Sequence, residues 1–270
     1  MTREEQVLGS IAAEMAAIPG HLGVYYKNLV TGFTWGIREE EAYQAASVIK
    51  LPLFLHILSQ SAAGNLSLEE RLTVTDRDKM PSCGALNLFA GEITVDIHTL
   101  CRLMIDLSDN TATNVLINRC TIPGANVGFR EMGLEKTVLR RLLFDRAAAA
   151  QGLENTICPR EMGMLLERLY RETFVSPSVS REAMDILLKQ KINHKLGGKL
   201  YGVPIAHKTG EDYRLSNDVG IVFAPEPFVL CFAGHDTDVY PWEDLMRRAA
   251  FDLYQAQHSD TERKPIWNTN

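Results

Sequence analysis

The chain has 270 residues, of which 46% are hydrophobic and 23% are charged, so its composition is that of an ordinary globular protein with a sizeable core. Its net charge is −6 and it contains no long basic run, which argues against nucleic acid and anionic membrane as partners. The length allows one domain or two closely packed ones.

The N-terminal region predicts a helix, a β-hairpin and a second helix. Residues 2–18 have amphipathic spacing and are followed by Pro19-Gly20, which favours a helix with a sharp stop. Residues 21–29 and 33–37 have strand character and are joined by a short turn. A further apolar helix opens near Ser47 and carries Pro52 in its first turn, where the missing N–H costs little.

The start of the chain also bears on location. Acidic residues stand where the first part of a secretory signal would be basic, and no segment is long enough to cross a bilayer. We therefore expect a cytoplasmic protein with no membrane partner, or an exported one if a signal has been removed.

The middle of the chain is mostly helical in character, and strands return near its end. Apolar periodicity predicts helices over 97–106, 114–120 and 161–171, then strands over 203–208, 218–224 and 228–234, and a last helix over 241–257. A polar tail through Asn270 follows, which we expect to be loose.

This order predicts an α/β (α+β) fold. One antiparallel sheet is built from both termini and flanked by helices, and an all-helical insertion interrupts it. We expect an α/β subdomain of residues 1–58 plus 196–270, an all-helical subdomain of residues 59–195, and the active site between them.

The cysteines and histidines suggest neither a disulfide framework nor a metal site. The five cysteines are odd in number and scattered, and none of them has metal-ligand spacing with the seven histidines. We expect reduced thiols, no metal and no cofactor. The expected partner is a small-molecule or peptide substrate, and the expected oligomeric state is a monomer.

Three short motifs together carry the groups that serine acyl transfer needs. They supply a nucleophilic hydroxyl, two lysines, a second hydroxyl and an amide. In chain order they are Ser47-Val48-Ile49-Lys50, Ser108-Asp109-Asn110 and Lys208-Thr209-Gly210.

In the first motif, Lys50 lies one helical turn from Ser47 and inside an apolar run. Desolvation favours the neutral amine, which can act as a general base toward a serine hydroxyl. The free N–H groups at the helix start can stabilise an oxyanion. The alternative is that Ser47 is an ordinary N-cap.

The second motif is a polar segment between two apolar helices. Its functional interpretation makes Ser108 a proton donor to the departing nitrogen, and Asn110 a hydrogen-bond partner of the substrate carbonyl. Asp109 would tie down backbone N–H groups of the turn. The alternative is a helix-to-helix turn whose polar side chains are caps.

The third motif lies on a predicted strand. Gly210 indicates close approach of another backbone or a ligand, while Lys208 and Thr209 would bind a substrate carboxylate. The alternative for Lys208 is an edge-strand gatekeeper. Arg214 could clamp the same carboxylate, or be an exposed turn arginine.

These motifs resemble those of the class A β-lactamases and the wider penicillin-recognising serine hydrolases. The resemblance also covers Phe129-Arg130-Glu131-Met132-Gly133-Leu134 and Asn217-Asp218-Val219-Gly220, and it spans roughly residues 20–255. It implies an acyl-enzyme on Ser47, with Lys50 as base or proton shuttle and Ser108 and Lys208 at the leaving nitrogen. The backbone N–H groups of Ser47 and Glu211 would form the oxyanion hole.

The chain departs from that family in the loop between Thr137 and Pro159. β-Lactamases of the family carry a glutamate there that activates the deacylating water, and the corresponding position here falls near Leu143. Asp145 and Glu154 are the nearest acids, and Asp145 is the candidate base. We therefore expect acylation by β-lactams followed by slow deacylation.

Two alternatives follow from the missing glutamate. The protein could be a D-alanyl peptidase, a transpeptidase or an esterase with the same chemistry. It could also be a binding or sensing module that acylates once without turnover. Cys83 would lie at the rim of the cleft, either exposed and reactive or packed.

Overall fold

The computed structural model describes residues 1–258, and the tail expected to be loose lies outside them. Its centre is a five-stranded sheet in the order β2-β1-β9-β8-β7, with every neighbouring pair antiparallel. The strands are β1 (His21–Asn28), β2 (Thr34–Ile37), β7 (Ile205–Asp212), β8 (Leu215–Val222) and β9 (Phe228–His235). The sheet therefore joins both ends of the chain, which confirms the predicted α+β class.

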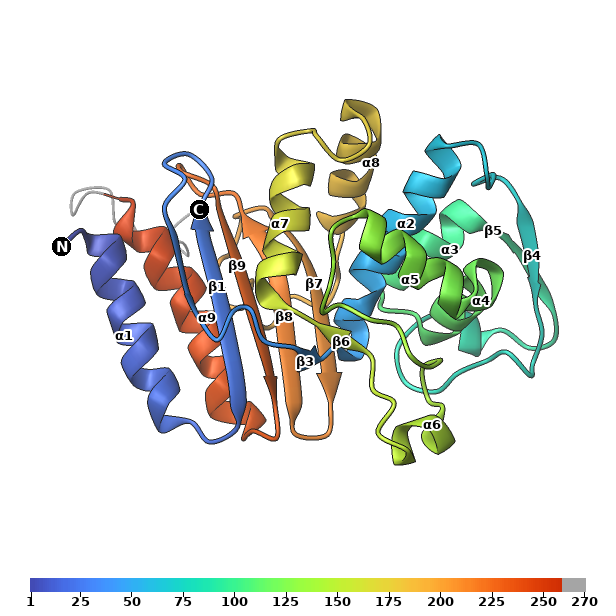
Figure 1. Cartoon of the computed structure of the whole chain (residues 1–270), viewed down its shortest axis with the longest axis horizontal. Helices are drawn as coiled ribbons and strands as arrows, with labels where there is room; N and C mark the ends of the chain where they lie inside the picture. Colours follow the sequence, from blue (N-terminus) through green and yellow to red (C-terminus); the bar gives the residue numbers. More distant parts are fainter. Residues whose placement is uncertain (259–270) are drawn as a thin grey trace, which may run out of the picture.

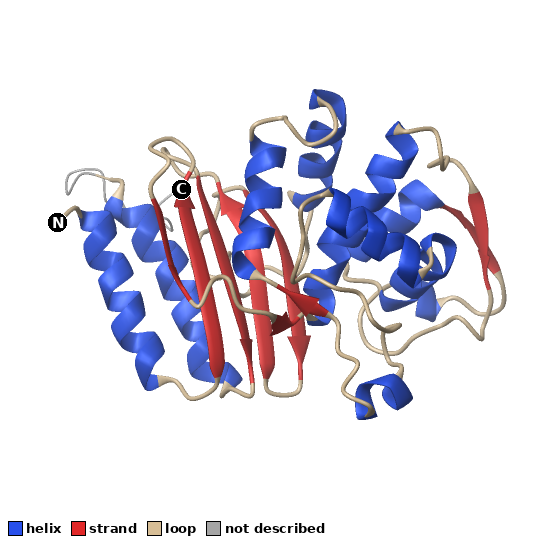
Figure 2. Cartoon of the chain, in the orientation of Figure 1, coloured by secondary structure: helices blue, strands red, loops and turns tan. Residues whose placement is uncertain are grey.

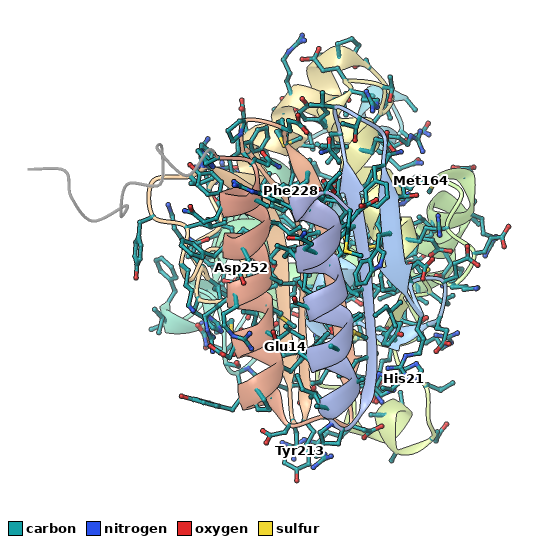
Figure 3. The ribbon with its side chains drawn as sticks, turned by 90° about the vertical axis from the view of Figure 1, so that its left-hand side faces the viewer. Glu14, His21, Met164, Tyr213, Phe228 and Asp252 are labelled. Atoms are coloured by element: carbon teal, nitrogen blue, oxygen red, sulfur yellow. The ribbon has the colours of Figure 1, made fainter. Side chains whose placement is uncertain are left out.

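Helices cover both faces of the sheet, so β1, β7, β8 and β9 are mostly buried, while the edge strand β2 is partly exposed. Along β9, Phe228, Leu230 and Phe232 pack in the core that the sheet forms with α1 (Arg3–Ala17) and α9 (Val239–Ala256). The alternate residues of β9 belong to the larger core on the opposite face. Figure 3 shows α1 and α9 lying side by side against the sheet.

The opposite face carries α7 and the helical half of the molecule (Figure 1). The helices on this side are α2 (Lys50–Ala62), α3 (Ile97–Asp106), α4 (Asn110–Cys120), α5 (Ile122–Glu131), α6 (Arg146–Ala150), α7 (Pro159–Tyr170) and α8 (Pro177–Leu187). The edge strand β7 is the strand next to this half, and it contacts α8 and the segment that leads into α2. The candidate site lies where β7 meets the helical half.

The segment 59–195 was expected to be all helical, and the structure differs there. β4 (Arg71–Val74) and β5 (Ile93–Asp96) pair as a small antiparallel sheet, visible at the far end of the molecule in Figure 2. Two further short strands, β3 (Tyr43–Gln44) and β6 (Thr156–Ile157), pair with each other near the site. The division into two subdomains remains a prediction.

Two further observations concern the described residues. All five cysteines are free thiols, as expected from their spacing. None of the described helices combines the length and apolar character that a membrane crossing needs.

Candidate active site

A cleft of about 590 Å³ opens between the β7 edge of the sheet and the helical half. Most of the residues singled out from the sequence line it. They are Ser47, Cys83, Ser108, Asn110, Asp145, Thr209, Gly210 and Glu211, and the loop residues Leu143 and Glu154 join them. Lys50 and Lys208 are fully buried behind this surface. The fold thus brings the three motifs, far apart in sequence, to one place.

Ser47 lies in a 3-10 turn, Ala46–Ile49, that runs directly into α2. Neither the turn nor α2 has a side-chain cap, so the alternative that Ser47 is an N-cap is wrong. Ala46 has φ 40, a left-handed conformation that is strained for a residue with a side chain. The structure therefore holds Ser47 at the cleft on a constrained backbone, with its hydroxyl not used in helix capping.

Three acceptors surround the Lys50 nitrogen. Its Nζ lies 2.7 Å from the Ser108 carbonyl oxygen, 2.8 Å from Asn110 Oδ1 and 3.0 Å from Ser108 Oγ. Burial and, secondly, the nearby Lys208 charge hold the pKa of Lys50 well below its usual value. A neutral amine fits these contacts, because two N–H groups can serve the two carbonyl oxygens while its lone pair accepts from the Ser108 hydroxyl.

Ser108 stands between the two lysines. Its Oγ is 3.0 Å from Lys50 Nζ and 3.2 Å from Lys208 Nζ, and its backbone is left-handed, with φ 54. Burial lowers the pKa of Lys208 from the usual 10.5 to about 7, even though Asp218 favours its charged form. The Ser108 hydroxyl thus lies between two lysines whose pKa values are both lowered by burial, an arrangement suited to moving a proton across the site.

Asp109 and Asn110, the other residues of the second motif, bond to the segments around Ser108. The Asp109 carboxylate accepts the N–H groups of Ala85, Leu86 and Ala112 at 2.7, 2.9 and 2.9 Å, as expected for a residue that ties down the turn. The Asn110 amide accepts from Lys50 and donates to the Pro81 carbonyl at 3.1 Å. Its predicted contact with substrate remains a prediction.

Gly210 is a position of close approach, as its place on the strand suggested. A Cβ there would lie 2.9 Å from the Ala45 carbonyl oxygen and 3.1 Å from the Val48 nitrogen. Strand β7 therefore packs backbone against backbone on the turn that carries Ser47. This contact brings the Gly210–Glu211 peptide to the nucleophile, where the Glu211 N–H was predicted to complete an oxyanion hole.

The loop opposite β7 has no unengaged acid at the position where the family has glutamate. Asp145 caps the short helix α6 by accepting the Ala148 N–H at 3.0 Å. Glu154 is paired with Arg141, at 2.6 Å between Oε2 and Nη2. Leu143, near which the sequence places that position, lines the cleft, and its backbone is fixed to the side chain of Asn114.

Arg214 lies outside the cleft that the three motifs line. It lies in the turn between β7 and β8, next to the highly exposed Tyr213 that marks the lower end of the molecule in Figure 3. Its guanidinium donates to the carbonyl of Asp236 at 2.8 Å, and it is not among the residues that line the cleft. This placement fits an exposed turn arginine, and the role of Arg214 as a carboxylate clamp remains a prediction.

Sequence reasoning missed two groups of buried polar residues behind β7. His207 faces acceptors with both ring nitrogens, Asp218 Oδ1 at 2.9 Å and Asn193 Oδ1 at 2.7 Å. Lys195 is fully buried and donates to the carbonyl oxygens of Gly210 and Asn217, both at 3.1 Å. Only the burial of these side chains distinguishes them from surface polar residues.

Within residues 1–258, one group of side chains has ligand atoms close enough for a metal ion. His194, Glu211 and Glu243 bring these atoms within 4.8 Å of one another, which their spacing in sequence does not indicate. The Lys195 ammonium already lies 3.1 Å from Glu211 Oε1 and 3.9 Å from Glu243 Oε1. The carboxylates are therefore already paired with a cation, and the group is best described as an ion-pair network.

Known proteins with this sequence pattern and fold are β-lactamases and a penicillin-binding relative. A beta-lactamase of Rhodobacter capsulatus is 31% identical over 179 residues, which are 65% of this chain and 60% of the length of that protein. A beta-lactamase of Stenotrophomonas maltophilia is 28% identical over 219 residues, 78% of this chain and 71% of that one.

Two solved structures superpose closely. The beta-lactamase of Sphaerobacter thermophilus has a TM-score of 0.84 at 25% identity, covering 93% of this chain and 95% of that one. PBP-A has a TM-score of 0.82 at 28% identity, covering 94% and 95%, and a leucine-to-glutamate mutant of it was solved as an acyl-enzyme with penicillin G. The Beta-lactamase enzyme family matches residues 7–257, nearly all of the described chain, and the chain belongs to that family.

Proposed function

We propose that this protein is a serine hydrolase that forms an acyl-enzyme on Ser47 with β-lactams or related amides and esters, and that it releases the acyl group slowly. The observation that carries the proposal is the position of Ser108. Its hydroxyl lies within 3.2 Å of two buried lysines, beside a serine whose own hydroxyl caps no helix. Membership of the β-lactamase family supports the same chemistry.

In the acylation step, Ser47 Oγ attacks the amide carbonyl while its proton passes to neutral Lys50. Oγ forms an ester with the carbonyl carbon, the C–N bond breaks, and the nitrogen takes a proton through Ser108. The Lys208 ammonium, 3.2 Å from Ser108 Oγ, favours this transfer and attracts an anionic substrate. The backbone N–H groups of Ser47 and Glu211 bind the oxyanion.

Deacylation needs a base that activates a water molecule on the ester. The two loop acids are engaged, Asp145 as the cap of α6 and Glu154 with Arg141. Leu143 can neither accept a proton nor hold a water molecule at the position where β-lactamases of the family have glutamate. We therefore propose that hydrolysis of the ester, rather than its formation, limits turnover.

A second candidate is a penicillin-binding enzyme that acts on D-alanyl peptides or small esters. It is favoured by the 28% identity to PBP-A, which is named as a penicillin-binding protein rather than a β-lactamase. Both candidates use the same acyl-enzyme chemistry on Ser47 and differ in their substrate.

Active-site labelling tests the shared part of the two candidates. A fluorescent penicillin and a fluorophosphonate should each label Ser47, and peptide mass mapping should locate the adduct. Ser47→Ala should abolish labelling, while Ser59→Ala, which changes a serine farther along α2, should leave it intact. Undiminished labelling of Ser47→Ala would end the proposal.

A further inference from the structure

Lys195 is a buried cation that lies behind the candidate oxyanion hole. None of its surface is exposed, and its Nζ donates to the carbonyl oxygens of Gly210 and Asn217, both at 3.1 Å. The residue belongs to neither the nucleophile motif nor the lysine–threonine–glycine motif. Burying a lysine is costly, so these partners indicate a specific role.

The contact with Gly210 is significant because of the peptide it belongs to. The Gly210 carbonyl and the Glu211 N–H are the two ends of one planar amide, and they point in opposite directions. A cation on the oxygen draws electron density through the amide and makes the N–H a stronger hydrogen-bond donor. By binding the Gly210 carbonyl, Lys195 therefore strengthens the Glu211 N–H as a donor, although this N–H points away from the lysine.

The second contact fixes the position of this peptide. Asn217 pairs with Gly210 across β8 and β7, and its side chain donates to the carbonyl oxygens of Gln44 and Ala45 at 2.9 and 3.0 Å. Lys195 thus links the Gly210–Glu211 peptide to Asn217 on β8, and Asn217 in turn holds the backbone at Gln44 and Ala45, just before Ser47. The backbone next to Lys195 is itself held in place, because the N–H of Leu196 donates to Asp218 Oδ2 at 3.1 Å.

Two carboxylates lie near the Lys195 nitrogen. Glu211 Oε1 is 3.1 Å away and half exposed, while Glu243 Oε1 is 3.9 Å away and mostly buried. Glu243 is also bonded to Ser216, at 2.8 Å. These carboxylates balance the charge of Lys195 without replacing its hydrogen bonds to the backbone.

We infer that Lys195 is a positioning residue for acylation: by binding the Gly210 carbonyl it orients and polarises the Glu211 N–H that receives the oxyanion. The inference rests on the proposed acyl-enzyme. Loss of a complete oxyanion donor costs about 10²–10³-fold in rate. Without Lys195 the Glu211 N–H would remain but would be less polarised and less well aligned. The acylation rate should therefore fall by less than this, by about 10-fold.

The test measures acylation rate together with the infrared carbonyl stretch of the acyl-enzyme, using penicillin labelled with ¹³C at the lactam carbonyl. A strong oxyanion hole lengthens the ester C=O bond and lowers its stretching frequency. Lys195→Met should slow acylation and move the ester band to higher frequency, whereas Lys195→Arg should keep the band near its original position. Lys195→Gln, whose amide can donate hydrogen bonds without charge, should be intermediate and serves if the methionine variant does not fold.

Two controls separate this role from a purely structural one. Glu243→Gln changes an anionic neighbour of Lys195 and should leave the band in place, and Lys189→Met changes an exposed lysine nearby in sequence and should alter nothing. A folded Lys195→Met protein with the original band and acylation rate would overturn the inference. Failure of the unaltered protein to acylate at Ser47 would instead overturn the proposed function.

Discussion

Asn114 binds Leu143 through both polar atoms of the leucine backbone. The Leu143 N–H donates to Asn114 Oδ1 at 2.9 Å, and the Leu143 carbonyl accepts from Asn114 Nδ2 at 3.0 Å. The two bonds fix the loop at the place where the cleft meets helix α4, and Leu143 lines the cleft there. An acid introduced at this position would therefore start from an ordered backbone.

The first prediction is that Leu143→Glu shortens the life of the acyl-enzyme by about 10²-fold or more, the usual contribution of a general base. The new carboxylate would activate water on the Ser47 ester. Loss of the penicillin adduct, followed by intact mass after rapid removal of excess ligand, measures the effect. Leu143→Gln is the matched control, because it has the same shape without a base; an equal acceleration in the glutamine variant would contradict the account.

The second prediction concerns Lys50. Lys50→Ala should slow acylation by about 10²-fold or more, because it removes the base next to Ser47 and one of the two lysines that contact Ser108. Stopped-flow acylation by a penicillin measures the rate, and circular dichroism shows whether the fold is kept. A loss below about threefold would reduce Lys50 to a structural role.

The third prediction is a fall in acylation as pH rises through about 7, the pKa to which burial lowers Lys208 from its usual 10.5. The ammonium is present below this pH and is lost above it, so the favourable charge at Ser108 and at the substrate disappears. Acylation rates between pH 5 and 9 measure the profile. Lys208→Arg keeps its charge throughout this range and should flatten the alkaline limb; an unchanged limb would show that another group titrates.

The fourth prediction is that Arg214→Ala changes acylation by less than about threefold, a free-energy difference below about 1 kcal/mol. Its guanidinium is bonded to the Asp236 carbonyl in an exposed turn and lies outside the cleft. Rates with substrates that carry or lack a carboxylate give the comparison. A tenfold loss confined to the carboxylate-bearing substrate would restore the clamp that the sequence suggested.

Much of the fold and the site follows from local sequence. Helix 97–106 has the same bounds in the structure, because Asp96 caps it and its apolar residues repeat at helical spacing. Lys50, Ser108 and Lys208 could be predicted because each belongs to a short motif that is recognisable in the sequence, although only the fold brings them together. The small strands β4 and β5 were missed because four-residue strands joined by a long loop give a weak signal.

Lys195 could not have been found in this way. Its partners Gly210 and Asn217 are 15 and 22 residues further along the chain, on two strands whose register brings them together. In sequence, Asn193-His194-Lys195 has the composition of an exposed polar turn. Burial, which depends on how the whole sheet packs, makes this lysine part of the site.

The fate of the acyl group tests the central claim most directly. The unaltered protein should be mixed with a chromogenic cephalosporin, and both colour and intact protein mass followed over time. We predict one stoichiometric burst of colour and a covalent adduct on Ser47 that persists for minutes or longer, with neither in Ser47→Ala. Continuous turnover of order 10² s⁻¹, well inside the ordinary range of enzymes, would contradict slow deacylation and show that the site has a base that activates water on the ester.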